Sequence, residues 1–321
     1  MKKRVLVTGG AGFIGSHIVE ALLSHGERVN VLDNFSTGFR RNLKPYRGDI
    51  HLIKGDIRDR RAVRKAMEAV SHVFHEAAIR NVAKSVEDPF LCHDVDATGT
   101  LILLEEALRR RVERFIYASS SAVYGDVRKF PQRETDPLRP VSPYGSAKLA
   151  GEHYCINFFS SHGLPAVCLR YFNVYGPRQN PESKYSSVIP AFIDKLVRGK
   201  VAVVDGTGRQ SRDFVYVGDV AEANLKAAFG DKRSLGKVIN IATGRAYSVL
   251  DVLKAVARAA GLKPKMRFGP PRPGDAAKTL GDISQARKCL GWRPDVGFEE
   301  GVMKTVHWFL TKRGGFPRAS S

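Results

Sequence analysis

The sequence predicts an α/β protein in which a doubly wound parallel sheet is followed by a smaller C-terminal domain. Short runs of β-branched residues alternate with helical stretches over the first half of the chain, and a glycine-rich turn directly follows the first run. Strands that alternate with helices imply a parallel sheet with helices on both faces. After about residue 176 the alternation gives way to connections rich in glycine and proline, which marks the second domain.

The apolar pattern places the elements of the first domain in order. A strand is expected at 4–8, and the helical spacing of apolar residues from Phe13 to His25 predicts a helix that stops at Gly26. We expect further strands, each flanked by helical segments, at 28–32, 50–54, 72–76, 112–118 and 165–170.

The boundary between the two domains is expected where this alternation ends. Residues 1–175 are assigned to the first domain, and residues 176–321 mainly to the second. A strand and a helix at 214–230 and a strand at 237–242 have the pattern of the first domain. We therefore expect 214–243 to rejoin the first sheet.

The composition is that of a basic globular protein. Its 321 residues include 52 basic and 32 acidic side chains, a formal net charge of +20. The basic residues are spread along the chain without a nucleic-acid-binding motif, so no specific nucleic acid is expected as a partner. No apolar run approaches the roughly 18 residues of a membrane-spanning helix, and four scattered cysteines are typical of a reducing compartment. We expect a cytoplasmic protein.

The turn TGGAGFIG at 8–15 indicates a dinucleotide site. Gly9, Gly12 and Gly15 follow a predicted strand and open a predicted helix. In that context the glycines permit a tight turn, a close approach to a pyrophosphate and close packing of helix on strand. The free N–H groups at the start of the helix would then face the phosphates.

Asp33 stands at the end of the second predicted strand. A carboxylate there can accept both hydroxyls of the adenosine ribose and would repel a 2′-phosphate, which favours NAD over NADP. Arg40 and Arg41 lie nearby in the sequence and would soften that preference. An alternative for Asp33 is a local role as the cap of a turn.

Tyr144 and Lys148 are candidates for catalysis. They lie four residues apart at the start of a predicted helix, so both project from one face. A phenol has a pKa of about 10, and a nearby ammonium, together with a cationic nicotinamide ring, favours the phenolate. Ser120 and Ser121 follow a predicted strand, at the edge where open α/β sheets bind ligands. A hydroxyl there can hold a reacting alcohol, or simply make loop hydrogen bonds.

Several motifs that occur in order along the chain resemble those of one family. They are TGGAGFIG, Asp33, GDI at 55–57, HEAA at 75–78, SSSAVYG at 119–125, YGSAK at 144–148, RYFNVYGPR at 170–178, SRDFVYV at 211–217 and RPGD at 272–275. Together they resemble the extended short-chain dehydrogenase/reductases, and among these the nucleotide-sugar 4-epimerases related to UDP-glucose 4-epimerase. The resemblance implies a Rossmann-type NAD-binding domain, permanently held NAD and a UDP-sugar-binding C-terminal domain. It also implies a homodimer formed through helices near 90–110 and 145–162.

The resemblance assigns roles to individual residues. Tyr144 matches the catalytic base, Lys148 its ribose-binding helper, and Ser120 the catalytic hydroxyl, a role that Ser121 is close enough to share. The cofactor-binding residues that it implies are Gly9, Gly12, Phe13, Ile14, Gly15, Asp33, Asn34, Asp56, Ile57, Ala77, Ala78, Arg80, Tyr144, Lys148 and Tyr171. The substrate-binding residues are Ser120, Tyr144, Asn173, Val188, Arg212, Arg272, Asp275 and Thr279. The family usually has Asn where this chain has Asp96, and an aspartate cannot donate as the amide does.

The residues after the catalytic hydroxyl narrow the reaction. Related dehydratases place an Asp-Glu pair there and related decarboxylases a Glu, whereas this chain has Ser121 and Ala122. Elimination therefore lacks its acid and base. The sequence predicts an isomerase that epimerises a UDP-hexose at C4 through a 4-keto intermediate. No metal site is expected, because His72 and His75 flank a predicted strand without further ligands nearby.

The preferred sugar depends on one position after the RPGD motif. The resemblance implies that a bulky tyrosine there excludes N-acetyl groups, and this chain has Thr279. We therefore expect UDP-glucose and UDP-galactose as substrates, with room for their N-acetylated counterparts. A UDP-glucuronate 4-epimerase is the nearest alternative. Alternatives of another class are a non-catalytic NAD-binding regulatory protein and a nucleic-acid-binding protein.

Overall fold

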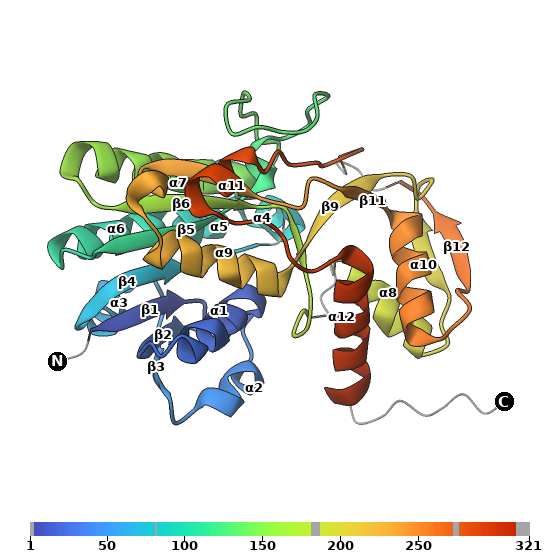
Figure 1. The fold of residues 1–321 in the computed structure, drawn as a ribbon, viewed down its shortest axis with the longest axis horizontal. Helices are drawn as coiled ribbons and strands as arrows, with labels where there is room; N and C mark the ends of the chain where they lie inside the picture. Colours follow the sequence, from blue (N-terminus) through green and yellow to red (C-terminus); the bar gives the residue numbers. More distant parts are fainter. Residues whose placement is uncertain (1–2, 81, 181–186, 272–275, 313–321) are drawn as a thin grey trace.

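A seven-stranded parallel sheet forms the centre of the molecule (Figure 1). The structure is a computed structural model that describes residues 3–80, 82–180, 187–271 and 276–312. The strand order is β10-β6-β5-β4-β1-β2-β3. All of these strands are parallel, and the order in which the chain adds them reverses between β1 and β4. The strands are β1 (Arg4–Thr8), β2 (Val29–Asp33), β3 (Ile50–Lys54), β4 (Val70–His75), β5 (Arg114–Ser120), β6 (Ala166–Tyr171) and β10 (Lys237–Ile241). The predicted doubly wound parallel sheet is confirmed.

Helices cover both faces of this sheet, as continuous apolar strands require. One face is buried under α1 (Phe13–Ser24), α9 (Val217–Phe229) and α11 (Ser284–Leu290). The other lies under α3 (Arg60–Ala66), α5 (Pro89–His93), α6 (Gly99–Arg109) and α7 (Pro143–His162). Shorter helical segments connect them: α2 (Arg40–Leu43), η1 (Lys44–Tyr46), α4 (Val82–Glu87), the π-helix η2 (Asp94–Thr98), η3 (Ser121–Val123) and η4 (Lys232–Ser234).

A second apolar core holds most of the C-terminal part together, beside the large sheet in Figure 1. Its helices are α8 (Val188–Val197), α10 (Val249–Ala260) and α12 (Phe298–Lys312). A three-stranded sheet has the order β11-β9-β7, and a two-stranded sheet pairs β12 with β8. These strands are β7 (Asn173–Tyr175), β8 (Ala202–Asp205), β9 (Ser211–Tyr216), β11 (Ala246–Ser248) and β12 (Met266–Gly269).

Residues 214–243 were expected to rejoin the first sheet, and only part of this stretch does so. Strand β10 pairs in parallel with β6, and α9 packs on the same sheet. Strand β9 was expected there as well, and that expectation was wrong. It pairs instead with β7 and β11, because β10 occupies the free edge of β6 and the chain leaves that sheet at Phe172 to form β7.

The seven main strands lie within two residues of their predicted positions. Of the helices that the structure describes, none is long and apolar enough to cross a membrane.

Candidate active site

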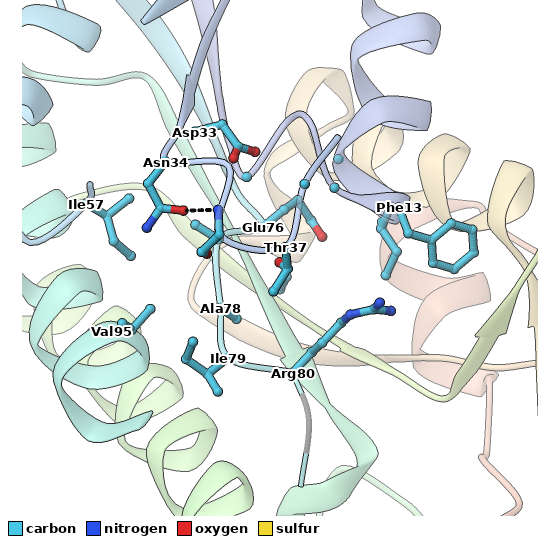
Figure 2. Close-up of a pocket in the computed structure, with 18 of the residues that line it drawn as sticks. Phe13, Asp33, Asn34, Thr37, Ile57, Glu76, Ala78, Ile79, Arg80 and Val95 are labelled. Atoms are coloured by element: carbon cyan, nitrogen blue, oxygen red, sulfur yellow. Dashed lines mark hydrogen bonds between the residues drawn. The ribbon is translucent and has the colours of Figure 1, made fainter. Parts of the chain in front are cut away.

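A cleft runs along the carboxyl edge of the central sheet, over the point where the strand order reverses. This is the edge where open α/β sheets bind ligands. Figure 2 shows part of its wall, with residues that follow β1, β2, β3 and β4. The structure brings all of the predicted cofactor residues to this cleft, namely Gly9, Gly12, Phe13, Ile14, Gly15, Asp33, Asn34, Asp56, Ile57, Ala77, Ala78, Arg80, Tyr144, Lys148 and Tyr171.

The glycine turn has the shape that a diphosphate needs. Gly9 has φ +67°, and a Cβ added to it would lie 2.8 Å from the backbone of Ala77. A Cβ on Gly15 would lie 2.3 Å from the carbonyl oxygen of Gly9. Helix α1 begins after its N-cap residue, Gly12. The structure describes the whole helix, and its start has no side-chain cap and no acidic residue in the first turn. Its first N–H groups are thus left for an anion, and these residues fit NAD.

Asp33 caps a local turn and also lines the cleft, so the two roles that the sequence left open are compatible. Its Oδ2 accepts from the N–H of Ala11 at 2.8 Å and its Oδ1 from the N–H of Phe35 at 2.7 Å, while the carboxylate lines the cleft. Arg40 and Arg41 are directed elsewhere, since their guanidinium groups stack on Phe35 and Phe39 at 4.4 and 4.1 Å. The carboxylate therefore faces the cleft with its preference against a 2′-phosphate intact.

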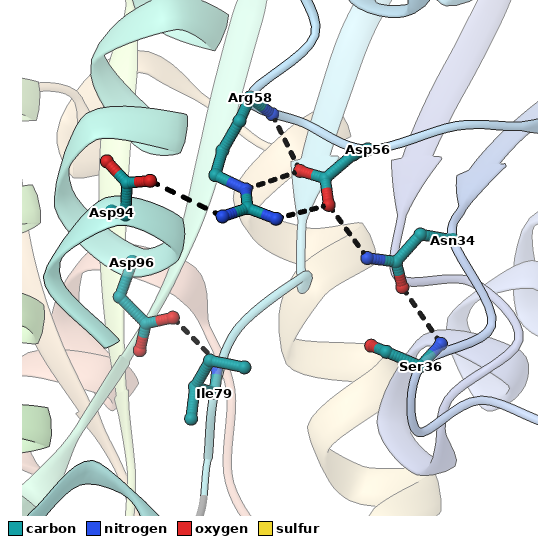
Figure 3. Close-up of polar contacts among 7 residues, drawn as sticks. All are labelled: Asn34, Ser36, Asp56, Arg58, Ile79, Asp94 and Asp96. Atoms are coloured by element: carbon teal, nitrogen blue, oxygen red, sulfur yellow. Dashed lines mark hydrogen bonds and ion pairs between the residues drawn. The ribbon is translucent and has the colours of Figure 1, made fainter. Parts of the chain in front are cut away.

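A network of polar side chains closes the adenosine end of the cleft (Figure 3). Asn34 Nδ2 donates to Asp56 Oδ2 at 2.9 Å. Arg58 donates to both oxygens of Asp56 through Nε and Nη2, each at 3.0 Å, and reaches Asp94 through Nη1 at 3.3 Å. These contacts with Arg58 lower the pKa of Asp56 to about 2. Asp56 is therefore a fixed acceptor at neutral pH.

The predicted reacting groups meet at the other end. Tyr144 lies in the first turn of α7, whose N-cap Ser142 accepts from the N–H of Gly145 at 3.1 Å. The hydroxyl of Ser120 lies close enough to the phenol of Tyr144 to favour its ionised form. Lys148 Nζ donates to the carbonyl oxygen of Ala118 at 2.8 Å and lies 6.0 Å from the centre of the Tyr144 ring.

The protein's own groups, without the charge of a nicotinamide ring, do not favour the predicted phenolate of Tyr144. Burial raises the pKa of Tyr144 well above its ordinary value, and the carboxyl of Asp96 adds to that shift. The hydroxyl of Ser120 and the charge of Arg80 act in the opposite direction and lower the pKa. The ammonium of Lys148 is turned toward Ala118 rather than toward the phenol. The predicted phenolate therefore needs a further positive charge in the cleft.

A buried ion pair beneath these groups was not predicted. Glu152 lies on α7 two turns after Tyr144, and it receives two hydrogen bonds from Arg170 of β6, at 2.8 and 2.7 Å. Both side chains are only 2% exposed. Glu152 also accepts from the hydroxyl of Ser119, next to Ser120. The pair thus ties α7 to the ends of β5 and β6. Sequence reasoning missed it because the partners meet only in the folded chain.

Two acidic residues near the reacting groups were also not given a role by the sequence. Asp96 Oδ1 accepts from the N–H of Ile79 at 2.7 Å (Figure 3), whereas its buried Oδ2 has no hydrogen-bond partner among the described residues. Burial raises the pKa of Asp96. Glu76 lines the cleft, and burial raises its pKa to about 7. The sequence signal that could have identified Glu76 as a site residue was its position directly after a buried strand, inside the motif HEAA.

Three of the predicted substrate residues, Asn173, Arg212 and Thr279, lie where β7 and β9 meet the segment after residue 276. Thr279 Oγ1 donates to Asn173 Oδ1 at 3.2 Å, and Thr279 N donates to the carbonyl oxygen of Ser211 at 3.0 Å. Arg212 is the next residue along β9, and Val188 begins α8. Ser121 begins the short helix η3. The predicted residues Arg272 and Asp275 lie outside the described residues.

The family follows from a sequence model that covers most of the chain. The model of the NAD dependent epimerase/dehydratase family matches residues 5–242. The chain belongs to this family. The predicted membership among the extended short-chain dehydrogenase/reductases and the predicted cofactor, NAD, are confirmed.

Solved structures of this epimerase/dehydratase family are similar over nearly the whole chain. A UDP-glucose 4-epimerase from Thermotoga maritima, solved with UDP-glucose, is 38% identical at a TM-score of 0.92, over 97% of this chain and 99% of that one. A UDP-N-acetylglucosamine 4-epimerase from Methanobrevibacter ruminantium, solved with UDP-N-acetylmuramic acid, is 38% identical at 0.92, over 97% and 100%. A UDP-glucose 4-epimerase from Thermus thermophilus, solved with NAD, is 43% identical at 0.87, over 97% and 99%.

The described residues of this family member contain no candidate metal site. No group of three or more His, Cys, Asp and Glu side chains there could hold a metal ion. The ring nitrogens of His75 are hydrogen-bonded to the hydroxyls of Thr8 and Thr100, at 2.9 and 2.8 Å. His72 Nδ1 lies 2.9 Å from the hydroxyl of Ser71.

Proposed function

We propose that this chain is an isomerase that uses NAD to epimerise a UDP-hexose at C4 through a 4-keto intermediate. The observation that carries the proposal is that Tyr144 and Lys148 line the cleft that fits the dinucleotide, with Ser120 close to Tyr144. The positions after Ser120 carry no acid or base for elimination. Relatives that act on UDP-glucose and UDP-N-acetylglucosamine support the same reaction.

In the proposed reaction the chain holds and deprotonates one hydroxyl. The hydroxyl of Ser120 lies near the phenol of Tyr144, so a sugar hydroxyl that reaches both meets an acceptor and a donor. Tyr144 takes the proton from the 4′-hydroxyl and later returns it. Bound NAD supplies a hydride acceptor, the site from which the hydride returns, and a positive ring charge that favours the phenolate. Lys148, held by Ala118, adds positive charge on the same side of the cleft.

The sugar has to present its other face before the hydride returns. The nucleotide must therefore be anchored strongly and the hexose loosely. Arg212 and Arg272 are proposed to bind the diphosphate, because arginine makes charge-assisted, often bidentate contacts with phosphate. Asn173, Val188 and Asp275 are proposed as the remaining contacts with the sugar nucleotide, and Ser121 as a second hydroxyl beside Ser120.

Thr279 is proposed to decide which hexoses enter. Its hydroxyl is held by Asn173, and the N–H of Asp213 lies 3.3 Å from the same oxygen. This short side chain leaves space that a tyrosine would fill. We propose that both UDP-glucose and UDP-N-acetylglucosamine are accepted.

We further propose that residues 1–175, with part of 214–243, form the NAD-binding domain, and that 176–321 mainly bind the sugar nucleotide. Three apolar clusters support this division, because two of them lie on the faces of the large sheet and the third lies among α8, α10 and α12.

A homodimer is proposed through the helices near 90–110 and 145–162, which are α5, α6 and α7. Phe90 is 86% exposed and Val86 62% exposed, and Phe90 lines a shallow pocket with Pro143 and Ala147 at the start of α7. Large exposed apolar side chains that gather on one surface are typical of protein interfaces.

A cytoplasmic location is proposed as well, and four buried cysteines without disulfides support it.

The test is to mix the purified protein with UDP-glucose, UDP-galactose, UDP-N-acetylglucosamine or UDP-glucuronate, without added cofactor, and to identify the products by NMR. Interconversion of UDP-glucose and UDP-galactose is the expected result. Conversion of UDP-glucuronate alone would favour the alternative epimerase. No conversion of any of the four sugars by NAD-loaded protein would contradict the proposed function.

A further inference from the structure

The proposed mechanism leaves one carboxyl group of the cofactor cleft without a role. Glu76 directly follows β4, and Figure 2 shows it in the wall of the cleft, between Asp33 and Ala78. A carboxylate is an unexpected side chain in a site that receives the diphosphate of a dinucleotide. Its position and its partners therefore require a physical reason.

The hydrogen bonds of Glu76 suit both of its protonation states. The hydroxyl of Tyr171 donates to Glu76 Oε1 at 2.7 Å. The same hydroxyl lies 3.1 Å from Asn224 Oδ1 and 2.8 Å from Asn224 Nδ2. A phenol has one hydrogen to donate. When Glu76 is ionised this hydrogen points to the carboxylate, and when Glu76 is protonated it can turn to Asn224 while the acid donates to the phenol.

The charges around Glu76 leave both states accessible near neutral pH. Burial raises the pKa of Glu76 to about 7, while the hydrogen bond from Tyr171 and the ammonium of Lys148 on α7 act in the opposite direction. The backbone N–H of Glu76 donates to the carbonyl oxygen of Thr8 on β1, and neither this carbonyl nor Asn224 on α9 carries a charge. The other charged side chains of the cleft wall are Asp33, Asp56 and Arg80.

Strand register places Glu76 at the reacting end of the cleft. Ser120 is the partner of Tyr171 across β5 and β6, and His75 is the partner of Tyr117 across β4 and β5. The nicotinamide ring has to lie beside the carbon whose hydroxyl Ser120 holds, since hydride passes between them. Glu76 and its partner Tyr171 therefore line the half of the cleft that receives the ring.

We propose that Glu76 sets the balance between the oxidised and the reduced cofactor in this cleft. Its carboxylate favours the oxidised ring, which carries a positive charge, and its neutral acid favours the reduced ring, which carries none. The coupling is reciprocal, so a hydride accepted from the sugar is accompanied by proton uptake from solvent at Glu76. Both electrons come from the sugar and return to it, and Glu76 exchanges only a proton. The inference rests on the proposed reaction solely for the position of the ring.

The test measures the midpoint potential of the cofactor bound to the whole protein. Wild type and Glu76→Gln are poised against mediator dyes of known potential, and the absorbance of reduced nicotinamide is followed across pH. At about pH 5.5, where Glu76 is protonated, the midpoint potentials of the wild type and of Glu76→Gln should coincide. Near about pH 8.5 the wild type should lie about 30 mV lower, which corresponds to a tenfold stronger preference for the oxidised form. Equal potentials at every pH would overturn the proposal.

Two further variants keep the test independent of any defect in folding. Tyr171→Phe retains the carboxyl but removes the donor that lowers its pKa, so the pH at which its potential begins to drop below that of Glu76→Gln should move upward. Asp33→Asn alters the matched carboxylate at the adenosine end, and it should weaken cofactor retention without changing the pH dependence of the potential. An unshifted curve for Tyr171→Phe, or an Asp33→Asn curve that flattens like that of Glu76→Gln, would also overturn the proposal. The measurement needs no sugar, so its failure is distinguishable from failure of the epimerase assay.

Discussion

The cofactor cleft and the proposed sugar-binding region, where β7 and β9 meet the segment around Thr279, assemble their residues in different ways. The cleft takes Gly9, Asp33 and Glu76 from the carboxyl ends of adjacent parallel strands, where Asp33 is the last residue of β2 and the other two directly follow β1 and β4. The sugar-binding region brings Asn173 and Thr279 together from segments more than a hundred residues apart. Parallel strands place their carboxyl ends at one edge, so local motifs define the cleft. The sugar-binding region depends on contacts that only the complete fold creates.

The largest expected effect separates chemistry from binding. Tyr144→Phe removes the proton acceptor but keeps the ring in its place, so turnover should fall by about 10²- to 10⁴-fold. Retention of NAD and affinity for UDP should stay close to the wild-type values, as measured by absorbance of the released cofactor and by calorimetry. Turnover that is unaffected would remove Tyr144 from the mechanism.

The second effect tests the support beneath the cleft. Glu152→Gln leaves the buried guanidinium of Arg170 without its counter-charge, and the free energy of unfolding should fall by about 3–5 kcal/mol. The matched control is Glu105→Gln, because Glu105 pairs with Arg60 on the surface, where both side chains are more than half exposed. This control should cost less than about 1 kcal/mol. Urea denaturation measures both, and equal losses would mean that the buried pair has no special weight.

A third variant acts on the sugar-binding region alone. Thr279→Tyr should reduce kcat/KM for UDP-N-acetylglucosamine about 10- to 100-fold relative to UDP-glucose, because the larger side chain fills the space of the acetyl group. NAD content should not change. Coupled assays of both sugars measure the ratio, and Thr279→Ser serves as the control. A ratio that Thr279→Tyr leaves unchanged would place sugar selection elsewhere.

The smallest effect concerns the unpaired oxygen of Asp96. Burial raises the pKa of Asp96 in the folded chain, so the folded state binds more protons than the unfolded state above the ordinary carboxyl pKa of about 4. Wild-type stability should therefore fall as pH rises from about 4 through the raised pKa. Asp96→Asn should lack this dependence and be more stable at neutral pH by about 1 kcal/mol. Parallel urea curves at several pH values measure it, and identical pH profiles would contradict the account.

Much of the cleft could be predicted because its signals are local. TGGAGFIG, Asp33 and the pair Tyr144 and Lys148 each lie within one turn or one strand end. The orientation of Lys148 toward Ala118 could not be predicted, since the carbonyl oxygen that accepts its hydrogen bond belongs to β5, thirty residues earlier in the chain.

The same limit applies to strand pairing. The pattern of β9 resembles that of the first domain, but its partners β7 and β11 are decided by which sheet edge is free. The two partners Glu152 and Arg170 also carry no local signal of their contact, because a helix and a strand bring them together.

The central claim is that the hydride removed from C4 returns to the same carbon within one site. UDP-galactose deuterated at C4 provides the most direct measurement, with the purified protein in ordinary water and without added cofactor. The account predicts that the UDP-glucose formed keeps its deuterium at C4 while the configuration at that carbon inverts. UDP-glucose that carries solvent hydrogen at C4 would contradict the account.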